Sequence, residues 1–167
     1  FRGDNNMQIQ LSQKERMFLE DAKIQEEVCI EKYNNYSGQT QDPQLKQLFN
    51  RLSGEEQHHH DIVNQMLQGQ QPNLSHAGLN LQSQQGTAQQ NTSQGTAGTQ
   101  QGNQRDKMLC TDLLSTEKYV SGTYDSDVFE SASPAVRQAM QHIQQEEQKH
   151  GEELFNYMNS HGMYNVK

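Results

Sequence analysis

Residues 43–63 read PQLKQLFNRLSGEEQHHHDIV, and residues 134–154 read PAVRQAMQHIQQEEQKHGEEL. The two segments align without a gap at an offset of 91 positions, and the same offset extends the match back to Met17 and Met108. Between residues 17 and 67, ten positions are identical to their equivalents, where unrelated segments would share roughly three. The chain is therefore predicted to contain one structural unit twice.

Each copy has the pattern of a helical hairpin, which is two helices joined by a turn. Ser12 with Glu15 forms a capping box, and apolar residues at helical spacing follow it. Asp42 can cap a second helix with Pro43 at its first position, and this helix is expected to stop near Gly69. The first copy is thus predicted to be a hairpin of two long helices.

The second copy repeats this order. Asn103 is expected to cap a third helix, and a turn is expected at Asp125–Ser131. Ser133 and Pro134 then begin a fourth helix, which should end near Gly162. Two hairpins joined by a long crossover predict an all-α fold, a four-helix bundle.

A Gln/Gly/Thr-rich segment separates the two copies. Its 37 residues carry no Asp, Glu, Lys or Arg, and they bury too little apolar surface to offset the entropy of ordering them. Without this segment the hydrophobic share rises from 31% to about 35%, enough for one modest core. We therefore expect one bundle domain made of an N-terminal tail (1–10), a first hairpin (11–67), the linker (68–104), a second hairpin (105–162) and a C-terminal tail (163–167).

Composition excludes several classes of protein. No apolar run approaches the roughly 20 residues that span a bilayer, and we expect no secretory signal ahead of the first helix. A net charge of −8 with scattered Lys and Arg disfavours nucleic acid as a partner. The two cysteines, Cys29 and Cys110, are too few for a disulfide scaffold or a Cys-rich zinc site, and a disulfide between them is not favoured.

The repeat carries six residues of types that bind metals. The first helix of each copy offers one glutamate, and the second helix offers a Glu-x-x-His motif. Residues three apart share a helix face, and the glutamates of each copy are 30 residues apart, which places all six groups at one level of the bundle. This is the ligand set of di-iron and di-manganese carboxylate bundles. The six are Glu26, Glu56, His59, Glu117, Glu147 and His150.

These residues interrupt otherwise apolar stripes; Glu26, for example, lies between Ala22 and Cys29. Four carboxylates in one buried layer cannot all ionise side by side, and each would cost several kcal/mol if left unpaired. Two divalent cations would remove this conflict; the alternatives are that the residues carry protons or that water enters the bundle. One Glu-x-x-His alone is usually a solvated helix face, but two copies aligned by an independent repeat favour metal.

Other polar residues lie near these positions. Glu55 and Glu146 are one position off the ligand face, and we expect them either at the surface or as hydrogen-bond partners of ligands. Asp21 and Asp112 could orient a ligand histidine or lie on the helix surface. His58 and His60 are expected to face solvent or a neighbouring element.

Two tyrosines occupy equivalent positions of the repeat. Tyr33 and Tyr124 lie seven residues beyond Glu26 and Glu117, which we expect to be the bridging carboxylates. Seven residues correspond to about 10 Å along a helix axis. We therefore expect these tyrosines to be core residues rather than radical or gating groups.

The stretch DKMLCTDLLSTEKYVSGTYDSDVFESASPAVRQAMQHIQQEEQKHGEELFNYMNSHGMY, residues 106–164, resembles the spore coat protein F family. The D-x-L-x-x-x-K-x-x-x-x-x-Y run, the S-P-x-x-R turn and the closing F-N-x-M-x-x-x-G-x-Y carry the resemblance. It implies a ferritin-like bundle and a place in the spore coat. The ligand pattern is similar to that of rubrerythrins and implies two Fe or Mn ions held by the six residues. The chain departs from rubrerythrins in lacking a Cys-x-x-Cys rubredoxin module.

Three functions are consistent with these features. The first is a spore coat protein whose bundle holds a carboxylate-bridged di-metal centre of Fe or Mn. The second is a di-metal oxidoreductase, acting as a peroxidase, catalase or ferroxidase in spore protection. The third is a metal-free structural module for assembly. The expected partners are other coat proteins or further copies of the chain as a homo-oligomer, in the spore coat or alternatively the cytoplasm.

Overall fold

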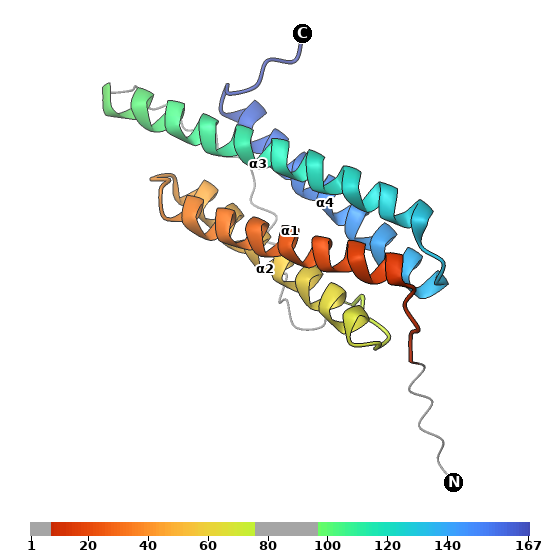
Figure 1. The fold of residues 1–167 in the computed structure, drawn as a ribbon. Helices are drawn as coiled ribbons and strands as arrows, with labels where there is room; N and C mark the ends of the chain where they lie inside the picture. Colours follow the sequence, from red (N-terminus) through yellow and green to blue (C-terminus); the bar gives the residue numbers. More distant parts are fainter. Residues whose placement is uncertain (1–7, 76–96) are drawn as a thin grey trace.

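Four helices form two hairpins in the computed structural model, which describes residues 8–75 and 97–167, and the side chains of the second range from residue 103 onward. They are α1 (Gln13–Ser37), α2 (Pro43–Leu67), α3 (Ala97–Glu130) and α4 (Pro134–Ser160). α1 packs along α2, α3 packs along α4, and the two hairpins lie against each other (Figure 1). The predicted all-α fold of two hairpins is confirmed. Most of the predicted N-terminal tail and linker lie outside the described residues.

The predicted caps begin three of the helices. Ser12 Oγ accepts from the Glu15 backbone amide at 3.1 Å, and Glu15 Oε2 accepts from the Ser12 amide at 2.8 Å, which completes the capping box. Asp42 accepts from the Gln44 amide at 2.8 Å, and the Ser133 side chain caps α4 in the same way. Glu15 also accepts from the Ser133 amide at 2.7 Å, so the starts of α1 and α4 are tied together.

The third helix differs from its prediction at both ends. It begins at Ala97, so Asn103 lies inside the helix rather than at its N-cap. The turn predicted at Asp125–Ser131 is wrong, because α3 continues to Glu130. The apolar spacing continues to Val128, which packs against the core and gives this last turn a buried face.

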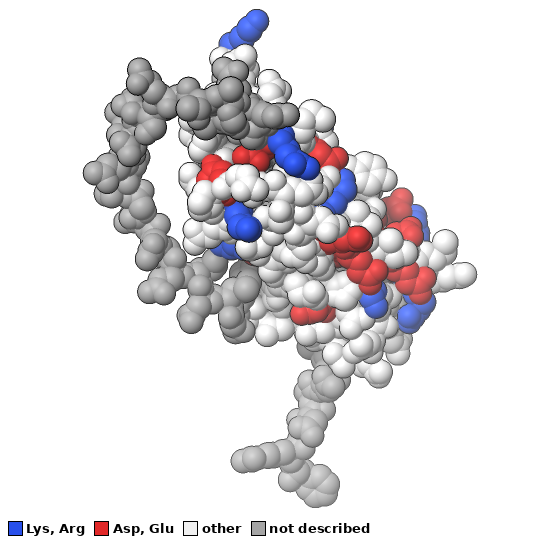
Figure 2. Space-filling model, turned by 90° about the vertical axis from the view of Figure 1, so that its left-hand side faces the viewer, with Lys and Arg blue, Asp and Glu red and all other residues white. Residues whose placement is uncertain are grey.

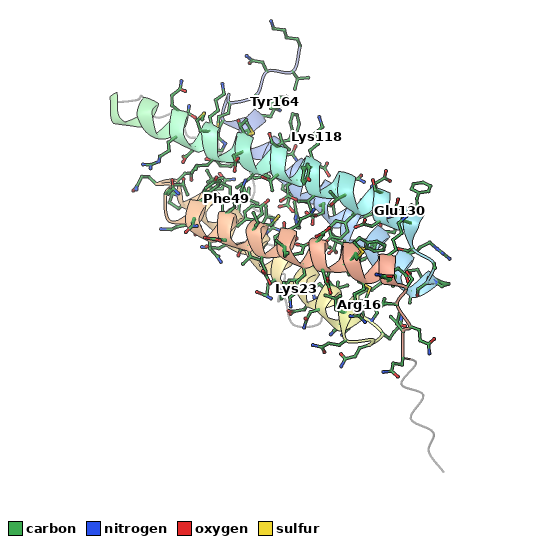
Figure 3. The ribbon with its side chains drawn as sticks, viewed as in Figure 1. Arg16, Lys23, Phe49, Lys118, Glu130 and Tyr164 are labelled. Carbon is green, nitrogen blue, oxygen red and sulfur yellow. The ribbon has the colours of Figure 1, made fainter. Side chains whose placement is uncertain are left out.

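The buried apolar residues form two clusters on either side of a polar layer. One cluster contains residues such as Leu19 and Met140 near the start of α1 and of α4. The other contains Phe49 and Leu113 near the start of α2 and along α3. In Figure 3, Phe49 lies between the helices, whereas Lys118 points away from them. The polar layer between the clusters is where the six predicted ligands meet.

The surface carries both signs of charge. On the face shown in Figure 2, Lys and Arg side chains are interspersed with Asp and Glu. Lys14 with Glu130 and Lys32 with Asp112 are ion pairs between α1 and α3. Among the described helices, none combines the length and apolar character that a membrane crossing needs.

Candidate metal centre

The six predicted ligands converge midway along the bundle. Each helix contributes at least one of them, because α1 and α3 carry one glutamate each while α2 and α4 carry a Glu-x-x-His motif each. All six side chains are essentially inaccessible to solvent, with residue exposures between 0% and 2%. They are Glu26, Glu56, His59, Glu117, Glu147 and His150.

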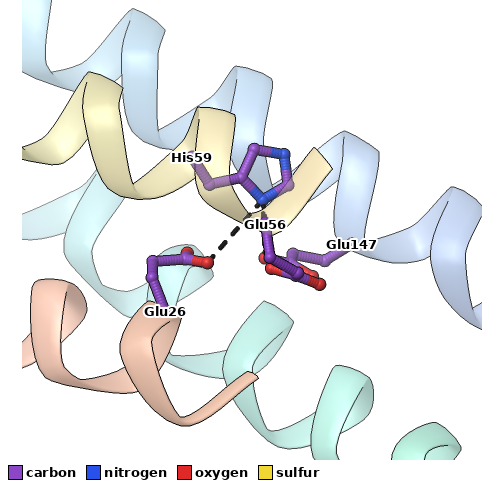
Figure 4. A group of neighbouring side chains, drawn as sticks. All are labelled: Glu26, Glu56, His59 and Glu147. Atoms are coloured by element: carbon purple, nitrogen blue, oxygen red, sulfur yellow. Dashed lines mark ion pairs between the residues drawn. The ribbon is translucent and has the colours of Figure 1, made fainter. Parts of the chain in front are cut away.

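The six residues form two overlapping groups, each with ligand atoms within 4.8 Å of one another. The first group is drawn in Figure 4, where the carboxylates face the His59 ring. Glu56 and Glu147 belong to both groups, whereas Glu26 and Glu117 belong to one group each. The shared glutamates are thus those of the Glu-x-x-His motifs, whereas the sequence predicts bridging by the α1 and α3 glutamates.

Both histidines turn Nδ1 toward the carboxylates. His59 Nδ1 lies 3.8 Å from Glu26 Oε2, 3.4 Å from Glu56 Oε2 and 3.2 Å from Glu147 Oε1. His150 Nδ1 lies 3.0 Å from Glu56 Oε1 and 3.4 Å from Glu147 Oε2. The two imidazole rings are stacked with centroids 5.4 Å apart. The arrangement is nearly two-fold symmetric, as the repeat predicts.

The donor set fits two divalent cations. Among the described residues, several buried atoms of this layer have no hydrogen-bond partner, including Glu26 Oε2, Glu117 Oε2 and both carboxylate oxygens of Glu147. Leaving such atoms unsatisfied is costly, whereas a cation would bind all of them at once. Carboxylate oxygens and imidazole nitrogens together suit first-row metals. The two overlapping Glu/His groups are therefore consistent with a di-metal site.

The Nε2 atom of each histidine contacts a glutamate of the other hairpin. His59 Nε2 lies 2.8 Å from Glu146 Oε2, and His150 Nε2 lies 2.9 Å from Glu55 Oε2. Of the two roles expected for Glu55 and Glu146, the structure supports that of hydrogen-bond partner. A carboxylate at Nε2 favours the tautomer whose Nδ1 is free to bind metal.

The aspartates do not take this role. Asp112 accepts hydrogen bonds from Tyr36 at 2.7 Å and from Lys32 at 3.0 Å at the surface between α1 and α3. Asp21 lines a surface groove between the same helices. Of the two roles expected for the aspartates, the structure supports the surface one, since both histidine Nε2 atoms face glutamates.

Two buried tyrosines also contact the layer of six proposed ligands. The Tyr33 hydroxyl donates to Glu117 Oε1, and the Tyr124 hydroxyl donates to Glu26 Oε1. Both are fully buried core residues, as expected. Their hydroxyls nevertheless reach the level of the glutamates seven residues away, because helical side chains lean toward the N-terminus and a tyrosine side chain is long. Burial and the neighbouring glutamates raise the pKa of both hydroxyls well above 10, so they remain donors.

Without a bound cation, the six residues differ in how readily they hold a proton. Burial and the charges of Glu147 and Glu56 raise the pKa of Glu26 and of Glu117 well above the ordinary value. Burial opposes the charge on Glu56, but hydrogen bonds from His150 and His59 outweigh it and lower its pKa. Burial alone would lower the pKa of both histidines, yet the carboxylates raise it. The metal-free layer is thus expected to hold protons where cations would bind.

The remaining predicted residues lie outside this layer or at its edge. Cys29 and Cys110 are buried free thiols in different apolar clusters. Burial, together with Glu56 and Glu26, raises the pKa of the Cys29 thiol and keeps it neutral. His60 is partly buried, with its Nε2 atom 3.3 Å from Glu27 of the neighbouring helix α1.

Two family models match the chain, one for each hairpin. Residues 105–167 match the Coat F domain, and residues 17–97 match Rubrerythrin. The expected resemblance to both families is confirmed, and the rubrerythrin match identifies the bundle as ferritin-like. Neither the curated proteins nor the solved structures include a match to this chain.

Proposed function

We propose that this chain is a spore coat protein whose ferritin-like bundle holds a carboxylate-bridged pair of iron or manganese ions. The observation that carries the proposal is that two buried Glu/His groups share Glu56 and Glu147. Two ions placed side by side would each have an imidazole and a further glutamate. The Coat F match supports the spore coat as the location. The proposed ligands are Glu26, Glu56, His59, Glu117, Glu147 and His150.

The surrounding residues prepare this layer for cations. Glu146 and Glu55 orient the imidazoles, so that Nδ1 faces the carboxylates. The Tyr33 hydroxyl donates to Oε1 of Glu117, and the Tyr124 hydroxyl donates to Oε1 of Glu26, so the Oε2 atom of each glutamate is left for a cation. The apolar clusters on both sides exclude water. A bound pair of redox-active ions would supply Lewis acidity and electron transfer toward peroxide or oxygen.

Metal content tests the proposal directly. We expect the purified wild-type protein to contain two equivalents of iron or manganese per chain by elemental analysis. The double variant His59→Ala/His150→Ala should lose them, because each ion loses its only imidazole. The matched control His60→Ala changes the histidine next to His59, whose ring lies against Glu27 and not in the layer of proposed ligands, and should retain both ions. A wild-type protein that takes up no metal when loaded with iron or manganese would contradict the proposal.

A di-metal oxidoreductase is the second candidate, as a peroxidase, catalase or ferroxidase. The buried tyrosine hydroxyls beside Glu117 and Glu26 favour it, since they would place hydrogen-bond donors next to the ions. Consumption of hydrogen peroxide by metal-loaded protein, absent from the His59→Ala/His150→Ala variant, would support it. A metal-loaded protein that leaves both peroxide and ferrous iron unchanged would restrict the pair to a structural role.

A metal-free assembly module is the third candidate. The raised pKa values of Glu26 and Glu117 favour it, because protons on these carboxyls remove part of the charge conflict. This candidate predicts that metal-free and metal-treated proteins unfold at the same temperature. An increase in the unfolding temperature on adding Fe²⁺ or Mn²⁺ would exclude it.

We propose that the chain self-associates through the face formed by α1 and α3. Within the helices that the structure describes, all exposed large apolar side chains lie on these two. One of them, Tyr119, lines a groove of about 700 Å³ between the two helices. Its lining also includes Lys118, Asp21 and Asp127, so that a second copy turned by a two-fold axis can pair opposite charges. The exposed apolar residues are Met17, Ile24, Val28, Met108, Tyr119 and Phe129.

Oligomeric state tests this face. Sedimentation over a concentration series should show a wild-type dimer or larger species, and Ile24→Glu/Phe129→Glu should be monomeric. The control Val166→Glu changes an equally exposed apolar residue in the C-terminal tail and should not alter association. A monomeric wild type would contradict self-association and would direct the same variants to binding assays with other coat proteins.

A further inference from the structure

The helices α1 and α3 lie side by side on one face of the bundle (Figure 1), and the repeat relates two places between them. One is the groove described above, which lies beside Glu26 because its lining includes Ala22 and Gln25. The offset of 91 relates it to a place beside Glu117, where Leu113 and Thr116 occupy the equivalent positions. These places are symmetry-related approaches to the layer of six proposed ligands.

Beside Glu117, a charged network links the two helices. Lys32 Nζ of α1 donates to Asp112 Oδ2 and to Thr116 Oγ1 of α3, each at 3.0 Å. The Tyr36 hydroxyl of α1 also donates to Asp112, at 2.7 Å. A cation that approached here would face the Lys32 ammonium and would have to separate these hydrogen bonds. This approach is therefore unfavourable for a cation.

Beside Glu26, two of the equivalent positions hold smaller residues. Ala22 stands where the other place has Leu113, and Gly122 stands where it has Glu31. A Cβ atom added to Gly122 would contact no neighbouring helix within 4 Å. A glycine inside a helix is less stable there than an alanine, and here the backbone lines an open groove instead of a close contact. Small residues thus keep this approach open.

One hydrogen bond joins the helices where the groove lies nearest to the layer. Thr123 Oγ1 donates to Gln25 Oε1 at 2.8 Å and also lies 2.8 Å from the Val120 carbonyl of its own helix. A hydroxyl has a single proton, so it can turn fully to that carbonyl when the Gln25 side chain moves away. Opening this contact therefore leaves the Thr123 donor satisfied.

The next residue on each helix belongs to the buried layer or contacts it. Glu26 follows Gln25, and Tyr124 follows Thr123. The Tyr124 hydroxyl donates to Glu26 Oε1, while Glu26 Oε2 has no hydrogen-bond partner among the described residues. An unsatisfied carboxylate oxygen thus lies directly behind the contact between Gln25 and Thr123.

Acidic residues give the groove the charge that attracts cations. Asp21 and Asp127 line it, and Glu130 lies close enough to Asp127 to act on its charge. Lys118 adds one positive charge to the same lining. The acidic groups outnumber this lysine, and a negative potential raises the local concentration of cations.

We propose, resting on the di-metal function above, that divalent cations enter the layer of six proposed ligands through this groove, past Gln25 and Thr123. Glu26 is the first proposed ligand that they meet. Gln25 and Thr123 act as a gate and not as ligands, and Lys32 with its partners keeps the symmetry-related place closed. A route sets the barrier between free and bound cation and leaves the two end states unchanged. Blocking it should therefore slow uptake and release equally.

Gly122→Leu fills the groove and tests the route. Uptake by metal-free protein is followed as the loss of the electron paramagnetic resonance signal of free Mn²⁺ after mixing, and release is followed after addition of excess chelator. Both rates should fall about tenfold while the dissociation constant stays unchanged. Glu31→Leu, which places the same side chain at the equivalent position of the other approach, should leave both rates within about twofold of the wild type.

Two results with Gly122→Leu would overturn the inference. One is uptake at the wild-type rate. The other is slow uptake with unchanged release, because the dissociation constant would then rise and the variant would have damaged the layer instead of the route. Leucine forms helices better than glycine, so the unfolding temperature in metal-free buffer should not fall.

The gate and the charges are tested without filling the groove. Gln25→Ala removes the bond to Thr123 and should raise uptake and release about threefold. Asp21→Asn/Asp127→Asn should slow uptake about threefold and weaken its dependence on salt, whereas Asp125→Asn, outside the groove lining, should not. Unchanged rates in Gln25→Ala would overturn the role of this pair as a gate.

The outcomes separate this inference from the function on which it rests. Wild-type protein that binds no Mn²⁺ would overturn both, whereas two bound ions with an unaffected Gly122→Leu variant would overturn only the route. All rates are compared at protein concentrations at which sedimentation shows a monomer, because self-association through the face of α1 and α3 would cover the groove.

Discussion

At one end of the interface between α1 and α3, Asp112 accepts hydrogen bonds from Tyr36 and Lys32. At the other end, the repeat places Asp21 at the position equivalent to Asp112 and Asp127 at the position equivalent to Tyr36. Burial, Glu130 and Asp21 raise the pKa of Asp127 to about 7. The same two positions thus form an attractive contact in one place and a repulsive one in the other.

The layer formed by the six proposed ligands shows no such divergence. All six proposed ligands and both tyrosines are identical between the copies. A changed ligand would leave buried charges unpaired, which costs several kcal/mol, whereas water compensates for most changes at the outer positions. Burial of polar groups, rather than helix formation, therefore sets how closely the two hairpins must agree.

The shared glutamates give the largest expected effect. Glu147→Ala should abolish retention of both ions, because both groups use this residue, while Glu117→Ala should leave one equivalent. Glu56→Ala should behave like Glu147→Ala if the layer is symmetric. Elemental analysis after desalting measures all three. Retention of one full equivalent by Glu147→Ala would show that this glutamate does not bridge.

Metal loading should stabilise the whole bundle. One site at a free metal concentration of 100 times its Kd adds about 2.7 kcal/mol, so two sites add roughly 5 kcal/mol. For a bundle of this size we expect the unfolding temperature to rise by about 10 °C or more. Calorimetry of metal-free and Mn²⁺-loaded protein tests this, with Mg²⁺ as the control ion that prefers oxygen ligands. An equal rise with Mg²⁺ would argue against a role for the imidazoles.

The tyrosines should give equal effects in the two halves. Tyr33→Phe and Tyr124→Phe each remove one buried hydrogen bond, which should cost about 1–2 kcal/mol in unfolding free energy. The control Tyr36→Phe removes a partly exposed hydrogen bond to Asp112 and should cost less. Urea unfolding of metal-free protein measures these values. A large difference between the first two variants would break the two-fold symmetry of the layer.

Removing the charge of Asp127, which lies beside Asp21 and Glu130, should have the smallest effect on stability, and this effect should depend on pH. The folded-state pKa of Asp127, about 7, lies above the ordinary 3.8, so its protonated form stabilises the fold below about pH 4. This contribution falls as the pH rises from about 4 to about 7. Asp127→Asn should therefore stabilise the protein by about 1 kcal/mol at pH 8, a value reduced for partial exposure, and have little effect near pH 4.

Thermal unfolding at several pH values measures this dependence. Asp125→Asn, a change of a more exposed carboxylate on the same helix, serves as the control and should not alter the pH profile. A constant difference between wild type and Asp127→Asn across the range would contradict the raised pKa.

Much of the fold is readable from the chain because its signals are local. The capping box at Ser12 and the caps at Asp42 and Ser133 mark three helix starts, and the repeat supplies the hairpin count. The end of α3 is not predictable from local signals. Polar residues from 125 to 131 have the composition of a turn, and only the packing of Val128 against the core shows why the helix continues.

The cluster of six proposed ligands is also predictable, since spacing and repeat identify its members without knowledge of the side-chain directions. The roles of their neighbours are not predictable in this way. Glu55 and Glu146 contact histidines across the hairpin interface, and which carboxylate comes closest depends on how α2 and α4 are rotated about their axes. By contrast, the contact of the Tyr33 and Tyr124 hydroxyls with the glutamates is predictable, because helical side chains lean toward the N-terminus.

Each hairpin completes the other's half of the site. The Tyr124 hydroxyl donates to Glu26, and the Tyr33 hydroxyl donates to Glu117. The glutamate at Nε2 of each histidine also comes from the opposite copy. Two separate copies of one hairpin, related by a two-fold axis, would therefore build the same layer. The covalent chain makes that encounter intramolecular and independent of protein concentration. The molecule thus has the architecture of a fused homodimer, in which the two outer faces differ while the proposed ligands and tyrosines of the shared interior are identical.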